Sequence, residues 1–409
     1  MLLASDATDE RLIHLKSPLD YARRFWHRVR GGELGMLPVI LGLIVICVAF
    51  QSQEPTFLSS RSLVSMTLYA APIGIIALGI VLVLLLGEID LSVGSVSGFT
   101  AATMAVLLVK HDQPLWIAMG AAIVLGAAIG LGYAALYTWI GVPSFVFTLA
   151  GLLAFQGALL AVLGKDGTIT LPSDSGLRTF ARNSFLTETQ AYLLIALIAA
   201  LYLGVQLLTI RRRRAAGLTP PNLVLALLKS GLLLGGLWWI TSYLYVARGW
   251  GYLPVLFVGL VVIVDLLLRR TPWGRHVFAV GGNEEAARRA GVKVGRTYAS
   301  VFVLCSTFAA LGGILLAGQL TSVSQSSGTT DTNLTAIAAA VIGGTSLFGG
   351  RGSAYSALLG VMVLQAIQSG LNVMNLAPEV RFIITGAVLL LAVAIDSVSR
   401  RARSSSGRG

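Results

Sequence analysis

The chain has 409 residues, of which 56% are hydrophobic and only 12% are charged, whereas soluble domains carry about 25% charged residues. This composition, with a mean hydropathy of +0.81, excludes a soluble globular protein and indicates a polytopic membrane protein. The formal net charge of +12 does not indicate nucleic-acid binding, because the basic residues lie in short segments between apolar runs and leave no soluble domain to bind it.

Twelve apolar stretches are candidate membrane helices, since a membrane span needs about 20 apolar residues. In chain order they cover residues 34–50, 62–86, 91–109, 115–140, 142–163, 191–209, 223–247, 252–268, 298–318, 335–348, 354–371 and 380–395. Several are short or rich in glycine, which is typical of half-helices and re-entrant segments. We therefore expect an all-α polytopic integral membrane protein with roughly 10–12 transmembrane helices, short broken or re-entrant segments and two pseudo-repeated halves.

Most basic residues gather in four segments: the N-terminal tail 1–33, the RRRR run at 211–214, the loop 269–297 and the C-terminal tail 398–409. Lys and Arg concentrate on the cytoplasmic side of membrane proteins, so all four segments and both termini are expected in the cytoplasm. A membrane domain at 34–397 lies between the tails, and the polar loop 164–190 is expected outside. The basic segments are also expected to attract anionic lipid.

A short helix is predicted from Asn283 to Ala290 inside the loop 269–297. Pro272 and Gly274 are expected to break any helix after the preceding span, with a turn at residues 281–283. Asn283 is a good N-cap residue, acidic residues occupy the first turn and basic residues the last, and glycine follows. Two Glu–Arg pairs are spaced four residues apart. Such a helix is either a solvated connector or a rigid contact that enters a cleft of a partner, and its candidate contact residues are Asn283, Glu284, Glu285, Ala286, Ala287, Arg288 and Gly291.

The sequence GEIDLSVGS at residues 87–95 places two carboxylates, Glu88 and Asp90, between two apolar runs. An unpaired carboxylate in the hydrocarbon is costly, so these acids are paired, wetted at an interface or functional. Asp90 is a candidate cap for the following helix, and a cap can also line a substrate path, because broken helices are tolerated beside water-filled cavities. The candidate polar positions along a translocation path are Glu88, Asp90, Ser92, Ser95, Asn372 and Asn375.

Three further patterns add expectations. GEIDLSVG (87–94) aligns with GGTSLFGG (343–350) at two glycines and a leucine, which favours an internal repeat. Asp265, inside an apolar stretch, is expected to pair with Arg269 or to reach the membrane interface. The two cysteines lie in apolar runs and the four histidines are scattered, so no metal site is expected.

Three stretches together resemble one family. They are RTPWGRHVFAVGGNEEAARRAGV (270–292), GEIDLSVGS (87–95) and LTAIAAAVIGGTSLFGGRGS (334–353), and they resemble bacterial ATP-binding-cassette (ABC) sugar-importer permeases of the ribose, galactose, arabinose and xylose group. The Glu in GEIDLSVGS and the long insert around 164–222 look like the xylose branch. The chain departs from the family at Asn333 and Thr335, on either side of Leu334, where the family commonly has acids.

The resemblance implies a permease subunit in the bacterial cytoplasmic (inner) membrane that moves a monosaccharide, such as the pentose xylose, into the cytoplasm. It implies a second permease subunit (a homodimer), an extracytoplasmic sugar-binding protein, and a separate ATPase subunit that binds ATP and Mg²⁺ and docks on the helix at 283–290. The chain has no G-x-x-x-x-G-K-[ST] motif, so we expect no enzymatic activity and no cofactor on this chain.

Two other functions remain open at this stage. A branched-chain amino-acid ABC permease has a similar plan. An ion-coupled secondary transporter would use Glu88 or Asp90 as a proton site, but it would not account for the capped helix in the loop 269–297.

Overall fold

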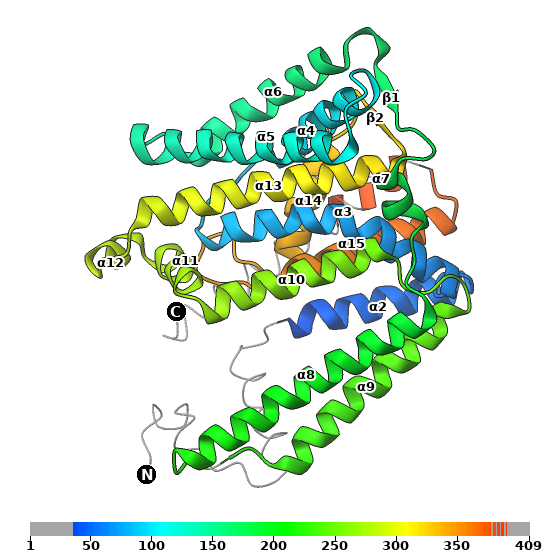
Figure 1. Ribbon diagram of the computed structural model, residues 1–409, viewed down its shortest axis with the longest axis vertical. Coiled ribbons are helices and arrows are strands. Elements are labelled where there is room, and N and C mark those ends of the chain that lie inside the picture. The colour runs from blue at the N-terminus through cyan, green and yellow to red at the C-terminus, as the bar shows by residue number, and fades with distance from the viewer. Residues whose placement is uncertain are drawn as a thin grey trace. The chain divides into compact units, whose positions relative to one another are not determined.

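The computed structural model (Figure 1) describes residues 36–218, 220–377, 379–381, 383, 384, 386, 387 and 390. The predicted tails 1–33 and 398–409 and most of the stretch 380–395 lie outside these residues. In the described part, the only sheet is a two-stranded antiparallel pair of Thr168–Thr170 (β1) with Ser322–Ser324 (β2). The predicted all-α class is confirmed.

The helices follow the apolar stretches of the sequence. In the part of the chain that the structure describes, eight are long and apolar enough to cross a membrane: α3 (Ser60–Leu85), α5 (Leu115–Ala135, continued to Ile140), α6 (Ser144–Leu163), α8 (Glu188–Ala215), α9 (Leu223–Tyr245), α10 (Tyr252–Arg270), α13 (Val294–Leu320) and α15 (Tyr355–Val373). Among the described residues, three apolar helices are shorter: α2 (Leu37–Gln53), α4 (Val93–Val109) and α14 (Thr330–Ile342). Short helices of this kind are expected from the sequence, although it does not single out these three stretches.

The chain divides into two compact units. The described part of the smaller unit, residues 186–218 and 220–250, is the α8–α9 hairpin. Thr187 begins α8 with a capping box, in which its hydroxyl accepts from the backbone N–H of Gln190. Near the same end, the rings of Tyr192 and Trp238 lie 4.3 Å apart, and the Tyr192 hydroxyl lies 2.9 Å from that of Ser242. These contacts join the two helices of the hairpin.

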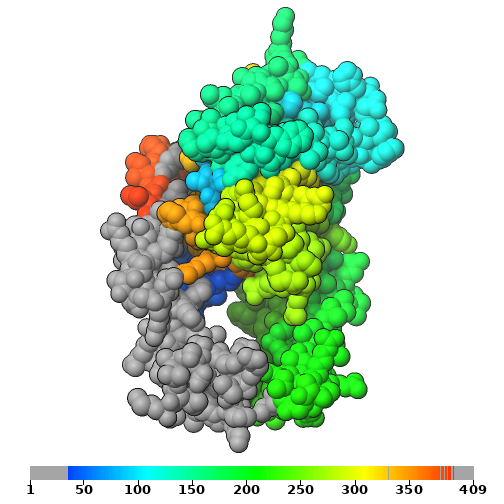
Figure 2. Space-filling model, turned by 90° about the vertical axis from the view of Figure 1, so that its left-hand side faces the viewer, coloured from blue at the N-terminus to red at the C-terminus, as the bar shows by residue number. Residues whose placement is uncertain are grey.

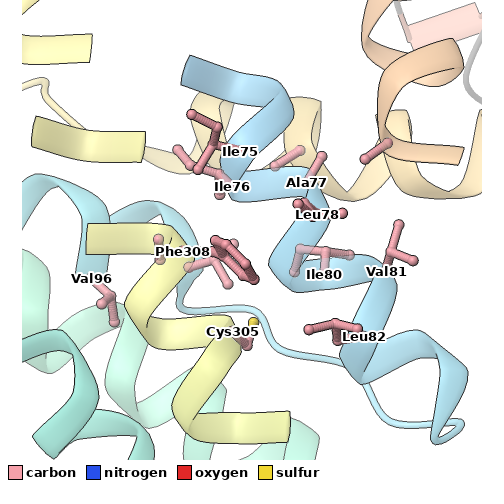
Figure 3. Close-up of a cluster of buried hydrophobic side chains, with 14 of the residues drawn as sticks. Ile75, Ile76, Ala77, Leu78, Ile80, Val81, Leu82, Val96, Cys305 and Phe308 are labelled. Atoms are coloured by element: carbon pink, nitrogen blue, oxygen red, sulfur yellow. The ribbon is translucent and has the colours of Figure 1, made fainter. Parts of the chain in front are cut away.

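The core of the larger unit lies around α3 and α13 (Figure 3). Ile76, Leu78 and Leu82 of α3 are fully buried, and they pack beside Cys305 and Phe308 of α13. α13 also packs on α4 and α5, so protein covers most of this helix. Cys305 is therefore a small residue of this core.

Small residues allow α13 to approach its neighbours closely. A Cβ atom on Gly130 of α5 would lie 2.6 Å from the carbonyl oxygen of Phe302, and one on Gly126 would lie 2.7 Å from the Cβ of Ala310. On another side of α13, a Cβ atom on Gly313 would overlap the carbonyl oxygen of Ser97 in α4. Close backbone approach at glycines is the usual packing mode of membrane helices.

The short helices α4 and α14 meet near their N-terminal ends. Asn333 of α14 donates a hydrogen bond from Nδ2 to the carbonyl oxygen of Leu91, at 2.6 Å, just before α4 begins. Gly94 and Gly98 of α4 pack directly on the backbone of residues 327–328. Asn333, one of the departures from the family pattern, therefore joins the two short helices.

Candidate coupling and translocation site

The predicted short helix is present as α12 (Glu284–Arg289), and it is capped at both ends. The side chain of Asn283 accepts a hydrogen bond from the backbone N–H of Ala286 at 2.9 Å. After the helix, Gly291 has a φ of +83°, which glycine adopts without strain, and its N–H donates to the carbonyl of Arg288. The self-capped helix expected at 283–290 is confirmed.

Both predicted ion pairs of α12 are formed. Arg288 lies 2.6 Å from Glu284, and Arg289 lies 3.1 Å from Glu285. The pairs are largely exposed, so each contributes only about 0.3–0.5 kcal/mol to the helix. Together with the caps, they hold six residues in a helix too short to be stable by propensity alone.

The segment before α12 differs from the prediction. Pro272 and Gly274 do not break the chain into loop; residues Pro272–Gly282 form a helix, α11. Proline at the first helical position has no N–H to leave unpaired and a φ already suited to a helix, and the hydroxyl of Thr271 accepts from the N–H of Gly274 as an N-cap. The indole N–H of Trp273 donates to Ser300, at 2.8 Å, and attaches α11 to α13.

The prediction that Ala287 of α12 contacts a partner is also wrong. Ala287 is only 5% exposed and belongs to the core of this chain, so it is not free to enter a partner's cleft. Ala286 is exposed, as are Asn283, Glu285, Arg288 and Gly291, and Glu284 is half-buried. The free face of α12 therefore centres on Ala286.

A cavity of about 620 Å³ lies between α12 and the turn that joins α5 to α6. In Figure 2 the yellow surface around α12 and the start of α13 adjoins the teal surface of this turn. Glu88 lines the cavity from the α3–α4 connection, Tyr137 from the end of α5 and Tyr298 from α13. Glu284 and Arg288 line it from α12. Glu88 belongs to the stretch 87–95 and α12 to the stretch 270–292. Two of the three stretches that resemble the family thus line one cavity.

Two tyrosine hydroxyls bind the carboxylates of this cavity. Tyr298 donates to Glu284 Oε2 at 3.3 Å, and Tyr137 donates to Glu88 Oε1 at 2.8 Å. The centroids of the two tyrosine rings are 4.2 Å apart. Neither tyrosine was predicted as a site residue, because a single tyrosine in an apolar stretch gives no local signal of its partner.

The three stretches 87–95, 270–292 and 334–353 meet at four glycines, Gly87, Gly281, Gly349 and Gly350. We call these four residues the glycine junction. The N–H of Gly350 donates to the carbonyl of Leu85 at 2.9 Å. A Cβ atom on Gly281, three residues before α12, would overlap the carbonyl oxygen of Leu85 and lie 2.9 Å from the nitrogen of Gly350. One on Gly349 would lie 2.5 Å from the carbonyl oxygen of Gly281. The backbone before α12 therefore contacts the connection between α3 and α4 and the connection between α14 and α15.

Asp90 is buried, and both of its carboxylate oxygens accept hydrogen bonds. One carboxylate oxygen accepts from the N–H and the hydroxyl of Ser92, at 2.8 and 2.7 Å, and the other accepts from Cys305 at 3.7 Å. Ser92 in turn accepts from the Tyr133 hydroxyl at 2.7 Å. The N-cap of α4 is Ser92, so Asp90 is not itself the helix cap; it fixes the turn that leads into α4.

The other predicted path positions are spread over the molecule. Among the described residues, Glu88 lines the cavity, whereas Ser95 is buried and donates to the carbonyl of Ser92. Asn372 accepts from Arg381 at the C-terminal end of α15, and Asn375 follows with a φ of +53°. The structure does not bring these two asparagines to the cavity, and a role of any of the six in translocation stays a prediction.

The expected pairing of Asp265 is confirmed. Arg269 lies 2.8 Å from Asp265, one turn away on α10. Ser353, at the end of the second glycine-rich connection, also donates to Asp265, at 3.3 Å. This pair therefore attaches α10 to the start of α15.

We expect Asp90→Ala to lower the thermal stability of the purified protein more than Asp90→Asn. Alanine leaves the buried donors of Ser92 without an acceptor, which costs about 1–3 kcal/mol. Asparagine keeps an oxygen for Ser92. Thermal unfolding in detergent, with transport measured at equal expression, tests this; equal losses in both variants would show that the negative charge itself is required.

The larger unit thus combines long apolar helices with shorter ones, and a capped polar helix lies between two of the long helices. This is the architecture of a multi-pass membrane transport protein. A family described as "Branched-chain amino acid transport system / permease component" matches residues 62–393. The chain belongs to this family.

Curated relatives cover nearly the whole chain. The xylose transport system permease protein XylH of Escherichia coli (strain K12) is 34% identical over 375 residues, which is 90% of this chain and 93% of the relative. XylH of Haemophilus influenzae is 32% identical over 89% of this chain and 96% of the relative. The ribose import permease protein RbsC of Bacillus subtilis is 28% identical over 89% of this chain and 94% of the relative. No solved structure matches the chain.

Proposed function

We propose that the chain is the membrane-spanning subunit of an ABC importer that carries a monosaccharide, specifically a pentose such as xylose, into the bacterial cytoplasm. Two copies form the pore in the inner membrane, with both termini in the cytoplasm. A separate ATPase subunit binds ATP and Mg²⁺, and an extracytoplasmic sugar-binding protein delivers the substrate. This chain contributes no catalytic residue.

The main support for the proposal is that α12 is capped at both ends and is attached to the core of the larger unit. A connector between two spans needs no cap at either end, whereas a helix that transmits force must be rigid. The exposed face around Ala286 is free for a partner, while Ala287 and Gly281 attach the helix to the core and to the glycine junction. A push on this face would reach the α3–α4 and α14–α15 connections directly.

The relatives support a pentose as the substrate. The two xylose permeases are 34% and 32% identical to this chain, and the ribose permease is 28% identical. Because the family description names branched-chain amino acids, leucine is the substrate to compare. An ion-coupled transporter is less consistent with the structure, because both carboxylate oxygens of Asp90 accept hydrogen bonds and α12 would have no purpose.

The test is a reconstituted complex. The chain is co-expressed with the ATPase and the binding protein encoded beside it, purified and placed in lipid nanodiscs. ATPase activity is then measured with the binding protein and xylose, ribose, galactose or leucine. We expect the ATPase to co-purify, and xylose to stimulate it most. Stimulation by leucine alone, or failure of any ATPase to co-purify, would contradict the proposal.

We expect Ala286→Trp to weaken retention of the ATPase by about tenfold, since overfilling a close-packed contact costs about 1–3 kcal/mol. Ala286 is exposed, so the chain itself accommodates the larger side chain. Ala216→Trp, at an exposed alanine after α8, is the matched control. Pull-down of the ATPase at equal membrane levels is the measurement. Normal retention by Ala286→Trp would mean that α12 is only a connector.

A further inference from the structure

We propose that Tyr137 and Tyr298 form a side-chain relay that transmits displacement of α12 to Glu88, and so to the start of α4. This inference rests on the proposed function and adds a side-chain connection to the backbone contacts of the glycine junction. It makes the two tyrosines positioning residues for coupling.

The relay begins at α12. Glu284 uses one carboxylate oxygen for Arg288, at 2.6 Å, and the other for the hydroxyl of Tyr298, at 3.3 Å. Because Arg288 and Glu284 lie on consecutive turns of one short helix, a movement of α12 moves the acceptor of the Tyr298 hydroxyl. Tyr298 stands in the second turn of α13, and only 2% of its surface is exposed.

The middle of the relay is a contact between rings. The Tyr298 and Tyr137 centroids are 4.2 Å apart, and both rings adjoin Phe302, with centroids at 6.5 and 5.9 Å. Phe302 is fully buried and provides a fixed support. A shift of the Tyr298 ring therefore displaces the Tyr137 ring toward the cavity, which has room for this movement because both tyrosines line it.

The relay ends at Glu88. The Tyr137 hydroxyl donates to Glu88 Oε1 at 2.8 Å, and a hydrogen bond to a carboxylate is stronger than one between neutral groups. Glu88 follows Gly87, whose φ is +82°, and lies two residues before Asp90, which fixes the turn into α4. The position of Glu88 therefore influences the connection between a full span and a shorter helix.

The experiment removes each hydroxyl and keeps the ring. Tyr137→Phe, Tyr298→Phe and the double variant are purified with the ATPase, and ATPase activity is measured with and without the sugar-loaded binding protein. We expect each single variant to reduce the stimulation about fivefold, within the usual range of coupling between sites. The double variant should lose no more than the stronger single variant, because both hydroxyls act in one series.

Tyr192→Phe is the matched control, since its hydroxyl lies 2.9 Å from Ser242 in the α8–α9 hairpin, outside the relay. It should leave the stimulation unchanged. Glu88→Gln keeps an acceptor for Tyr137 and should couple better than Glu88→Ala, a difference that a loss of general stability would not produce.

The outcomes separate the relay from the proposed function. A wild-type complex that no loaded binding protein stimulates would overturn the proposed function and the relay with it. A stimulated wild type, together with normally stimulated Tyr137→Phe and Tyr298→Phe variants, would overturn the relay alone. Losses that multiply in the double variant would also overturn it, because they would show two independent effects.

Discussion

Gly281→Ala is expected to abolish sugar uptake, although the chain should still reach the membrane. The new methyl group would overlap the carbonyl oxygen of Leu85 and meet the nitrogen of Gly350 at 2.9 Å. Both obstacles are backbone atoms, so no change of rotamer relieves the overlap. Either α11 moves away from α3, or the hydrogen bond between Gly350 and Leu85 breaks, at a cost of about 1–3 kcal/mol or more.

Gly282→Ala is the control for this experiment, because a Cβ atom at Gly282 meets nothing within 4 Å. The two variants make the same chemical change in neighbouring residues of one helix. Uptake of labelled xylose at matched membrane levels is the measurement, with ATPase pull-down beside it. We expect Gly282→Ala to transport like wild type. If Gly281→Ala also does so, the glycine junction is not part of the coupling path.

Gly130→Leu is expected to give the largest loss of stability. A Cβ atom at this position would already lie 2.6 Å from both the carbonyl oxygen of Phe302 and the Cα of Val303, and leucine adds three more carbon atoms. Helix α5 would have to separate from α13 along much of its length, because Gly126, one turn earlier, makes the same close approach. We expect little folded protein to be recovered in detergent.

Gly132→Leu provides the comparison, since Gly132 lies on the same helix and its Cβ position is open. It should give monodisperse protein with nearly wild-type thermal unfolding, and helix propensity favours leucine over glycine. The yield in size-exclusion chromatography and the unfolding temperature distinguish the two variants. Equal behaviour of Gly130→Leu and Gly132→Leu would show that the α5–α13 contact does not limit stability.

The sequence predicts best what depends on neighbouring residues. The apolar stretches locate the helices because a span must be apolar along its length, and the caps and ion pairs of α12 lie within nine residues of one another. The pairing of Asp265 with Arg269 follows from the spacing of one helical turn. In each case the interacting groups are held together by the same element.

The rest depends on contacts between distant residues. Asp90 accepts from Cys305, which lies 215 residues later, and Tyr137 contacts a tyrosine on another helix. Ala287 has the sequence context of a surface residue, but the fold covers it. The start of α11 was missed for a different reason: Pro272 was interpreted as a helix breaker, although the preceding Thr271 marks it as the first residue of a helix.

The two ends of the α8–α9 hairpin lie side by side, which bears on how the hairpin can be gained or lost in evolution. The N–H of Leu186 donates to the carbonyl of Trp250 at 2.8 Å, and in the larger unit Phe185 and Gly251 form an antiparallel bridge. The two ends of the hairpin are therefore already adjacent, so one deletion or insertion event could remove or add the hairpin with a very short join. Because the hairpin contributes an even number of crossings, such an event would leave every later loop on its original side of the membrane.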